Sequence, residues 1–168
     1  MFTLIIGGAA SGKSEYAEKH VLSLAGPRIY VATMEPWDDE CRARIAKHQK
    51  ARANRGFSTL ECYTGLAGAE LPPNSNVLLE CMSNLVANEL YDPAGGKAQA
   101  AIDGVFSLLC RCAHLTVVTN EVFSGGTDYE GDTLHYLWEL ARVNRVLAER
   151  ADRVVEVLSG LPNVFKGG

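Results

Sequence analysis

The sequence has no long hydrophobic run and no C-x-x-C pair, and each absence excludes a class of protein. A membrane-spanning helix needs about 18 or more consecutive apolar residues, whereas the apolar segment Phe2–Ile6 ends at a pair of glycines. No basic region precedes that segment, so it does not resemble a signal peptide. The five cysteines are an odd number and widely spread, which argues against a disulfide framework or a zinc site. We therefore expect a cytoplasmic protein with no membrane span and with reduced, mostly buried thiols.

Positive charge is also scarce. The chain has 16 Lys and Arg against 20 Asp and Glu, a formal net charge of -4, which is unlike the basic surface of a nucleic-acid-binding protein. Glycine and proline, at 16 and 6 residues, are too few for a fibrous or disordered chain, and 47% of the residues are apolar. The length of 168 residues predicts one soluble globular domain over residues 1–168. Any anionic ligand must then be held by a local cluster of basic side chains.

Short aliphatic runs alternate with longer amphipathic stretches, which is the pattern of strands and crossover helices in an α/β fold. We expect a mostly parallel sheet flanked by helices. The predicted strands are Thr3–Ile6, Arg28–Ala32, Ser58–Cys62, Asn76–Glu80, Leu115–Thr119 and Arg153–Leu158, and Asn163–Gly168 is a candidate edge strand. The predicted helices are Lys13–Leu24, Asp38–Ala53, Ser83–Tyr91, Lys97–Ala113 and Thr133–Ala151, and the predicted loops are Gly65–Ser75 and Phe123–Asp132.

The strongest motif is a complete G-x-x-x-x-G-K-S phosphate loop, placed after an aliphatic strand and at the start of a helix. It consists of Gly7, Gly8, Ala9, Ala10, Ser11, Gly12, Lys13 and Ser14. The glycines allow successive backbone N–H groups to turn inward on a phosphate, and Lys13 can reach the terminal phosphates. Ser14 would supply an oxygen to Mg²⁺. This context predicts a nucleotide site.

A magnesium site of this kind usually takes a carboxylate from the end of a second aliphatic strand. Glu80 stands at the end of Val77-Leu78-Leu79 and is the candidate. The alternative is that Glu80 only caps the helix that follows.

The segment Asp38–Ala53 places a histidine in a basic stripe. His48 is four residues from both Arg44 and Arg52, so the three side chains share one face of the predicted helix. Such a stripe can hold a triphosphate, and a neutral imidazole among cations is a competent nucleophile toward phosphorus. From spacing alone, however, a partly exposed histidine on a basic helix is the simpler interpretation.

Taken in order, the motifs resemble those of the bifunctional adenosylcobinamide kinase/adenosylcobinamide-phosphate guanylyltransferase family of cobalamin biosynthesis. The resemblance covers nearly the whole chain. It rests on the phosphate loop and on Tyr30–Thr33, Asp38–Glu40, Arg44 and Ile45 with His48 and Arg52, Leu78–Cys81 with Asn84 and Asn88, Val118–Val122 and Arg142–Asn144.

That resemblance implies a P-loop fold of the RecA-like type, a homotrimer and two reactions that need Mg²⁺, with ATP and GTP as substrates. First, a nucleoside triphosphate phosphorylates the aminopropanol hydroxyl of adenosylcobinamide. Then GTP donates GMP to a histidine with loss of pyrophosphate, and the GMP passes to adenosylcobinamide phosphate.

The resemblance also implies roles for single residues. His48 corresponds to the histidine that carries GMP, which overturns the interpretation from spacing alone. Glu61 corresponds to an acidic position near the nucleotide, where a carboxylate can accept the two N–H groups of a guanine edge. Glu80 corresponds to a family carboxylate, and Thr33 and Arg52 complete the nucleotide-binding set.

The sequence departs from the family pattern after Val122, where many members have a glycine-rich turn with a proline and an arginine. Here residues 123–132 are acidic and contain neither, and Phe57 stands where the family usually has Trp. We therefore expect altered contacts to the corrinoid or the base. Two alternatives stay open: a single-activity P-loop small-molecule kinase, in which His48 is a surface residue, and a non-catalytic nucleotide-binding switch. The switch is disfavoured because the chain has no N-K-x-D guanine motif.

Overall fold

The computed structural model describes residues 1–36, 39–122 and 129–167, except for the side chains of residues 40, 41, 44, 47, 48, 51 and 53. Strands and helices alternate along the chain. They are β1 (Phe2–Gly7), α1 (Lys13–Leu22), β2 (Arg28–Ala32), α2 (Asp39–Ala53), β3 (Phe57–Glu61), the 3-10 turn η1 (Leu66–Gly68), β4 (Asn76–Glu80), α3 (Met82–Tyr91), α4 (Lys97–Leu109), β5 (His114–Asn120), α5 (Gly131–Arg150), β6 (Arg153–Leu158) and β7 (Leu161–Lys166).

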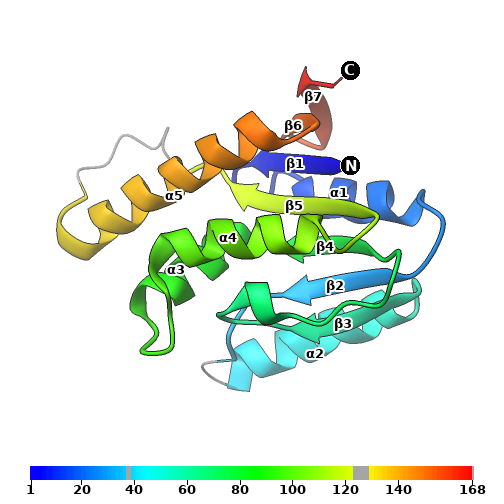
Figure 1. Ribbon diagram of the computed structural model, residues 1–168, viewed down its shortest axis with the longest axis horizontal. Coiled ribbons are helices and arrows are strands. Elements are labelled where there is room, and N and C mark those ends of the chain that lie inside the picture. Colours follow the sequence, from blue (N-terminus) through cyan, green and yellow to red (C-terminus); the bar gives the residue numbers. More distant parts are fainter. Residues whose placement is uncertain (37–38, 123–128, 168) are drawn as a thin grey trace.

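The strands form one 7-stranded sheet in the order β3-β2-β4-β5-β1-β6-β7 (Figure 1). The strands from β3 to β6 pair in parallel, and β7 is antiparallel to β6. Leu4 in β1 pairs with Val117 on one side and with Val154 on the other. Because parallel strands end at the same edge, the chain segments that follow β1, β2 and β4 meet there, which is where open α/β sheets bind their ligands.

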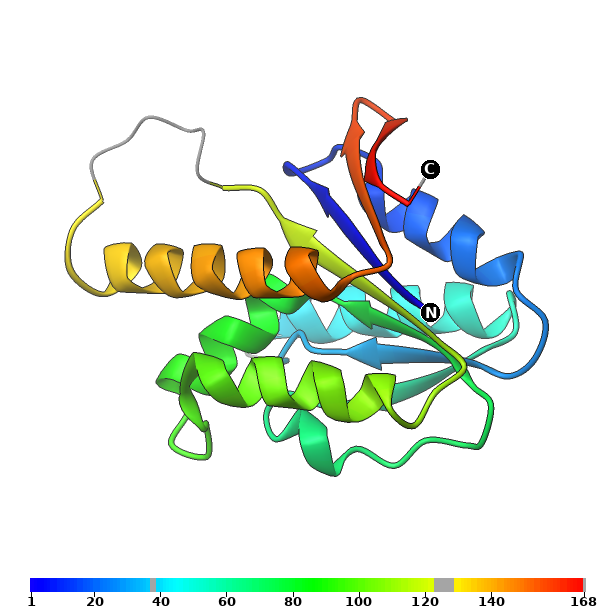
Figure 2. The ribbon, with the colours of Figure 1, turned by 45° about the horizontal axis from the view of Figure 1, so that its top comes forward.

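Helices cover both faces of the sheet, with α3, α4 and α5 on one face and α1 and α2 on the other (Figure 2). Successive residues of β1 point to opposite faces. Leu4 joins the core under α3, α4 and α5, whereas Ile5 joins the core under α1 together with Ala17 and Val21. Strands buried on both faces explain the continuous aliphatic runs in the sequence.

The predicted parallel α/β sheet is confirmed, and the bounds of β2, β4 and β6 agree with the prediction. Helix α4 ends at Leu109 rather than at Ala113, because the N–H of Ala113 donates to the carbonyl of Ser75 at 2.9 Å instead of continuing the helix. The predicted loop Gly65–Ser75 contains the turn η1.

Two further differences concern the C-terminal third. Helix α5 begins at Gly131, inside the predicted loop. Strand β7 begins at Leu161 instead of Asn163, because Leu158 pairs with Leu161 across a tight turn. Ser159 and Gly160 form that turn with φ of 51° and 79°, as a two-residue hairpin requires.

The described cysteines Cys62, Cys81, Cys110 and Cys112 are free thiols, as predicted. The expectation that they are mostly buried is wrong, since Cys110 is exposed and the other three are half-buried. Cys110 follows the last residue of α4, where the chain turns at the protein surface. Among the described residues, no helix is both long and apolar enough to cross a membrane.

Candidate active site

The phosphate loop of residues 7–14 joins β1 to α1 at the carboxyl edge of the sheet. Gly12 has φ of 89°, a left-handed conformation that favours glycine. A Cβ atom at Gly12 would lie 3.2 Å from the Cα of Gly160. The N–H of Gly160 donates to the carbonyl of Ser11 at 2.8 Å, and the N–H of Glu121 donates to that of Gly7 at 3.0 Å. Neighbouring strands thus fix the loop from both sides.

Lys13 is the first residue of α1 and is 9% exposed. Its Nζ donates to the carbonyl oxygen of Gly8 at 2.9 Å, so the ammonium group reaches back across the loop. Because this partner is a neutral carbonyl, the positive charge remains available to phosphate oxygens at the N-terminus of α1.

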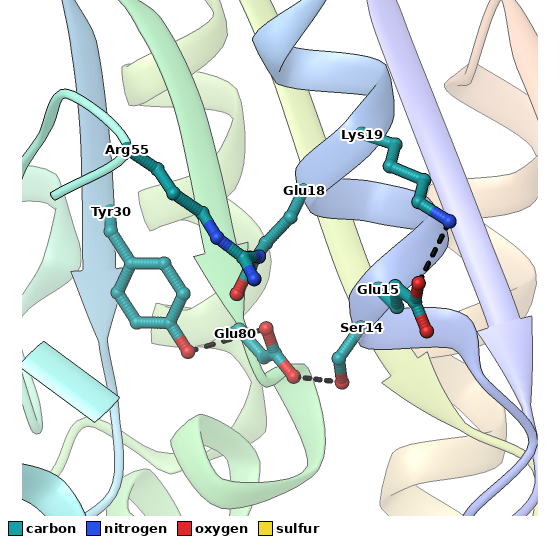
Figure 3. A network of polar contacts seen from close by, with 7 residues as sticks. All are labelled: Ser14, Glu15, Glu18, Lys19, Tyr30, Arg55 and Glu80. Atoms are coloured by element: carbon teal, nitrogen blue, oxygen red, sulfur yellow. Dashed lines mark hydrogen bonds and ion pairs between the residues drawn. The ribbon is translucent and has the colours of Figure 1, made fainter. Parts of the chain in front are cut away.

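Glu80, the last residue of β4, accepts two hydrogen bonds from residues on different elements (Figure 3). The Ser14 hydroxyl of α1 donates to Oε1, and the Tyr30 hydroxyl of β2 donates to Oε2 at 3.2 Å. Burial is the main cause that raises the pKa of Tyr30 well above its usual value, and the charge of Glu80 adds to it. The phenol therefore stays protonated and acts as a donor.

The structure brings together Ser14 and Glu80, the two residues predicted to bind Mg²⁺. A hydroxyl and a carboxylate are the hard oxygen ligands that Mg²⁺ prefers, so this pair fits the ion. The described residues contain no group of three or more metal-ligating side chains. Water and phosphate oxygens would therefore supply the remaining ligands, as is usual for Mg²⁺ at nucleotide sites.

A cavity of about 240 Å³ lies beside this pair. Pockets that enclose a whole small molecule begin at about 300 Å³, so the cavity suits part of a nucleotide, such as its phosphates. Its walls come from the helices α1, α2 and α3, from the strands β2 and β4, and from the residues that directly follow these strands. They are formed by Ser14, Glu18, Tyr30, Ala32, Met34, Ile45, Arg52, Glu80, Cys81 and Asn84.

Arg52 is the more buried of the two described α2 residues in this wall. It is 6% exposed, and its guanidinium carbon lies 3.5 Å from the centroid of the Tyr30 ring. The Nε atom of Arg52 is buried and has no hydrogen-bond partner in the described part of the chain. A buried guanidinium at a cavity wall is suited to a phosphate, but contact of Arg52 with a nucleotide stays a prediction.

His48 lies in α2, but its side chain is outside the described part of the structure, as are those of Arg44 and Lys47. The described residues on either side of it are informative. Ile45 and Arg52, which are three residues before and four residues after His48, both line the cavity.

Glu61, at the end of β3, lies in a different place from the residues above. Its two carboxylate oxygens accept from Gln49 Nε2 at 2.6 Å and from the Tyr63 hydroxyl at 2.9 Å. Burial raises the pKa of Tyr63 to about 12, with the hydrogen bond to Glu61 as the second cause. Glu61 lines a separate, open pocket of about 520 Å³ between α2 and β3. Its contact with guanine stays a prediction.

Thr33 directly follows β2 and is fully buried. Its hydroxyl donates to the carbonyl of Cys81 and accepts from the N–H of Cys81, both at 2.8 Å. Asn88 donates to the carbonyl of Thr33 at 2.9 Å. Thr33 therefore fixes the backbone next to Glu80, where the Glu80–Cys81 peptide bond is cis. Direct contact of Thr33 with a nucleotide stays a prediction.

Phe57, the first residue of β3, is 5% exposed and packs edge-on against Tyr30, with ring centroids 6.4 Å apart. This aromatic residue belongs to the core. Residues 123–128 of the divergent loop lie outside the described residues, so the predicted effect of that loop on corrinoid contacts stays a prediction.

Sequence reasoning assigned no role to Tyr30 or Glu18, both of which line the cavity. Glu18 forms an ion pair with Arg55, just beyond α2 (Figure 3). A signal for Tyr30 was available, because it is a tyrosine in the middle of the otherwise aliphatic run Ile29–Ala32. A hydroxyl in a buried strand must find a partner.

The chain matches the family described as cobinamide kinase / cobinamide phosphate guanyltransferase over residues 3–165. It is 35% identical to the "Bifunctional adenosylcobalamin biosynthesis protein CobU" of Escherichia coli and to that of Salmonella typhimurium, over 96% of this chain and 97% of each relative. It is 31% identical to the "Bifunctional adenosylcobalamin biosynthesis protein CobP" of Pseudomonas aeruginosa, over 99% of this chain and 98% of that relative.

Proposed function

The chain belongs to the cobinamide kinase / cobinamide phosphate guanyltransferase family, and on that premise we propose which residues perform the two reactions. It is an enzyme of adenosylcobalamin biosynthesis. One observation carries the proposal: residues of the phosphate-loop helix, of β4 and of α2 line the same cavity. This arrangement supports a single kinase and guanylyltransferase domain over residues 1–168.

In the first reaction, the phosphate loop binds ATP or GTP through its backbone N–H groups. The aminopropanol hydroxyl of adenosylcobinamide attacks the γ-phosphorus, and the bond to the nucleoside diphosphate breaks. Lys13 stabilises the charge that develops on the phosphate oxygens, because its ammonium is already held over the loop. Ser14 and Glu80 would hold Mg²⁺, which neutralises phosphate charge when it is bound.

In the second reaction, a ring nitrogen of His48 attacks the α-phosphorus of GTP, a P–N bond forms and pyrophosphate leaves. A phosphate oxygen of adenosylcobinamide phosphate then attacks the same phosphorus, which releases His48 and gives adenosylcobinamide-GDP. Arg52 holds phosphate oxygens, and Glu61 accepts hydrogen bonds from the guanine. The positions of Ile45 and Arg52 in the cavity wall support this role for His48, since residues three and four apart share a helix face.

We propose that the enzyme acts as a homotrimer in the cytoplasm. The free cysteines suit a reducing compartment.

The proposed trimer contact is the β6–β7 hairpin, where Leu158, Leu161 and Phe165 are 68%, 73% and 66% exposed. Clustered exposed apolar side chains of this kind usually mark a contact surface. Light scattering should give the mass of three chains, and the Leu161→Glu substitution should lower that mass.

The deciding experiment incubates the protein with GTP labelled on its α-phosphate and Mg²⁺, without corrinoid. We expect label on the protein that survives alkali and is lost in acid, as a phosphorus–nitrogen bond requires. His48→Ala should abolish the label and guanylyl transfer, while kinase activity falls much less. His114→Ala is the matched control, because His114 lies at the opposite end of the sheet, at the start of β5.

Labelling of the His48→Ala protein at the wild-type level would contradict the assignment. Kinase activity in a wild-type protein that never takes up label would instead favour the single-activity kinase.

A further inference from the structure

Tyr30, in the cavity wall, contacts residues of both proposed reaction sites through different atoms. Its hydroxyl donates to Glu80 Oε2 at 3.2 Å, and the face of its ring lies under the Arg52 guanidinium at 3.5 Å. The residue is 6% exposed, so both contacts are shielded from water. Tyr30 thus connects β4, which carries Glu80, with α2, which carries Arg52 and His48.

The hydroxyl contact restricts the rotation of a carboxylate. The terminal torsion of a glutamate side chain is soft. A carboxylate that is hydrogen-bonded only to Ser14 could therefore rotate about this torsion. Glu80 is instead held at both oxygens, by Ser14 from α1 and by Tyr30 from β2. The hydroxyl of Tyr30 therefore fixes the direction in which Glu80 presents its remaining lone pairs.

The ring of Tyr30 stabilises the buried charge of Arg52. Arg52 is buried, yet among the described residues it has no ion-pair partner. An unpaired buried cation is costly, and an aromatic face offsets part of that cost without using any of its N–H donors. The Nε donor of Arg52 has no hydrogen-bond partner among the described residues, so it is available to an anionic ligand.

We propose that Tyr30 is a positioning residue with two separable actions. Its hydroxyl orients Glu80 for phosphoryl transfer, and its ring holds the Arg52 guanidinium in position for guanylyl transfer. This inference rests on the proposed roles of Glu80 and Arg52. It assigns to one side chain the alignment of both half-reactions around a shared cavity.

Two substitutions separate the two actions. Tyr30→Phe keeps the ring and removes the hydroxyl, so we expect the Mg²⁺ concentration for half-maximal binding of a non-hydrolysable ATP analogue to rise roughly 3-fold to 10-fold. Calorimetry measures this binding without turnover. The rate of protein labelling from α-labelled GTP at saturating Mg²⁺ should stay within about 2-fold of the wild type, because the cation–π contact persists.

Tyr30→Leu removes the ring as well. The Mg²⁺ requirement should rise as in Tyr30→Phe. The labelling rate should now fall on the order of 10-fold or more, because Arg52 loses its cation–π contact. Phe57→Leu is the matched control: Phe57 packs on the same ring but is not in the wall of this cavity. It should lower the melting temperature without raising the Mg²⁺ requirement.

A wild-type Mg²⁺ requirement in Tyr30→Phe would overturn the proposal. The proposal would also be overturned if the Mg²⁺ requirement and the labelling rate worsened equally in Tyr30→Phe and Tyr30→Leu, in proportion to the loss of stability of each variant. That pattern would indicate a purely structural role. These outcomes are distinct from a failure of the proposed function, which would appear as a kinase-active Lys13→Met or a labelled His48→Ala.

Discussion

The phosphate loop and helix α2 both border the active-site cavity, but they are held in place very differently. The loop follows β1, which is paired on both sides within the sheet, and backbone hydrogen bonds from Gly160 and Glu121 fix it. Helix α2 covers the sheet edge at β3. Among its described side chains only Arg52 is buried, and the contacts described for it include those of Arg52 with Tyr30 and of Gln49 with Glu61.

This difference suits the two proposed reactions. A loop that binds phosphate must keep its N–H groups aligned before the ligand arrives, and backbone bonding in the middle of a sheet achieves this. In the proposed second reaction, the helix that carries His48 would receive GTP and then the large adenosylcobinamide phosphate. Only one of the side chains described for α2 is buried, and sparse burial is typical of elements that have low local stability and move during function.

The sharpest way to break the phosphate loop is to remove its cation. Lys13→Met should lower phosphoryl transfer to cobinamide by on the order of 10³-fold or more, because the charge developing on the phosphate is then uncompensated. A kinase assay with labelled γ-phosphate measures the loss. Lys19→Met is the matched control on the same helix, since Lys19 is exposed and its ion pair in the described structure is with the nearby Glu15. Near-normal turnover in Lys13→Met would place the kinase site elsewhere.

The magnesium pair at the loop should be next in sensitivity. Glu80→Gln keeps the side-chain volume and removes the charge, so we expect Mg²⁺-dependent nucleotide binding to weaken about 10-fold to 100-fold with the fold intact. Titration calorimetry at several Mg²⁺ concentrations measures the change. Glu15→Gln, on the exposed face of α1, should leave binding unchanged. Unaltered Mg²⁺ dependence in Glu80→Gln would mean that Glu80 only caps α3.

The backbone of the loop gives a smaller effect, on stability. Gly12→Ala should lower the free energy of unfolding by about 1 to 2 kcal/mol, because Gly12 has φ of 89° and a Cβ there meets Gly160 at 3.2 Å. Chemical denaturation measures it. Gly8→Ala is the control for stability, since a Cβ at Gly8 has nothing within 4 Å. Equal stabilities of the two variants would contradict the conclusion that the turn between β6 and β7 holds the phosphate loop in place.

The two regions also differ in how far the sequence predicts them. The phosphate loop is contiguous in the chain, so its residues, its strand and its helix could be predicted together. The pairing of Ser14 with Glu80 was also predictable, because both follow parallel strands that end at one edge. The bounds of the buried strands β2 and β4 follow from their aliphatic runs.

The contacts of α2 could not be predicted in this way. Arg52 and Tyr30 are far apart in sequence, and a tyrosine in a strand is ordinarily core, so only the packing of α2 on the sheet shows the cation–π contact. The spacing of His48 left a surface histidine as the simpler interpretation, and the family resemblance was needed to change it. The end of α4 was misplaced because a tertiary bond from Ala113 to Ser75 replaces the helical one.

The smallest expected effect tests how loosely α2 is attached. Arg55, just beyond α2, forms an ion pair with Glu18 of α1, with side-chain exposures of 54% and 15%, and thereby links the end of α2 to the phosphate-loop helix (Figure 3). Arg55→Ala should lower the global free energy of unfolding by less than about 1 kcal/mol, as for most partly exposed pairs.

Amide hydrogen exchange within α2 should nevertheless accelerate several-fold in Arg55→Ala while exchange in α1 is unaffected, because local opening is governed by local contacts. Arg42→Ala is the matched control, since the contacts described for Arg42 are with Asp39 inside α2 and with the carbonyl of Pro36 just before it. If exchange in α1 accelerated as much as in α2, or if global stability fell by far more than the ion pair explains, the two regions would unfold as one unit and the contrast between them would fail.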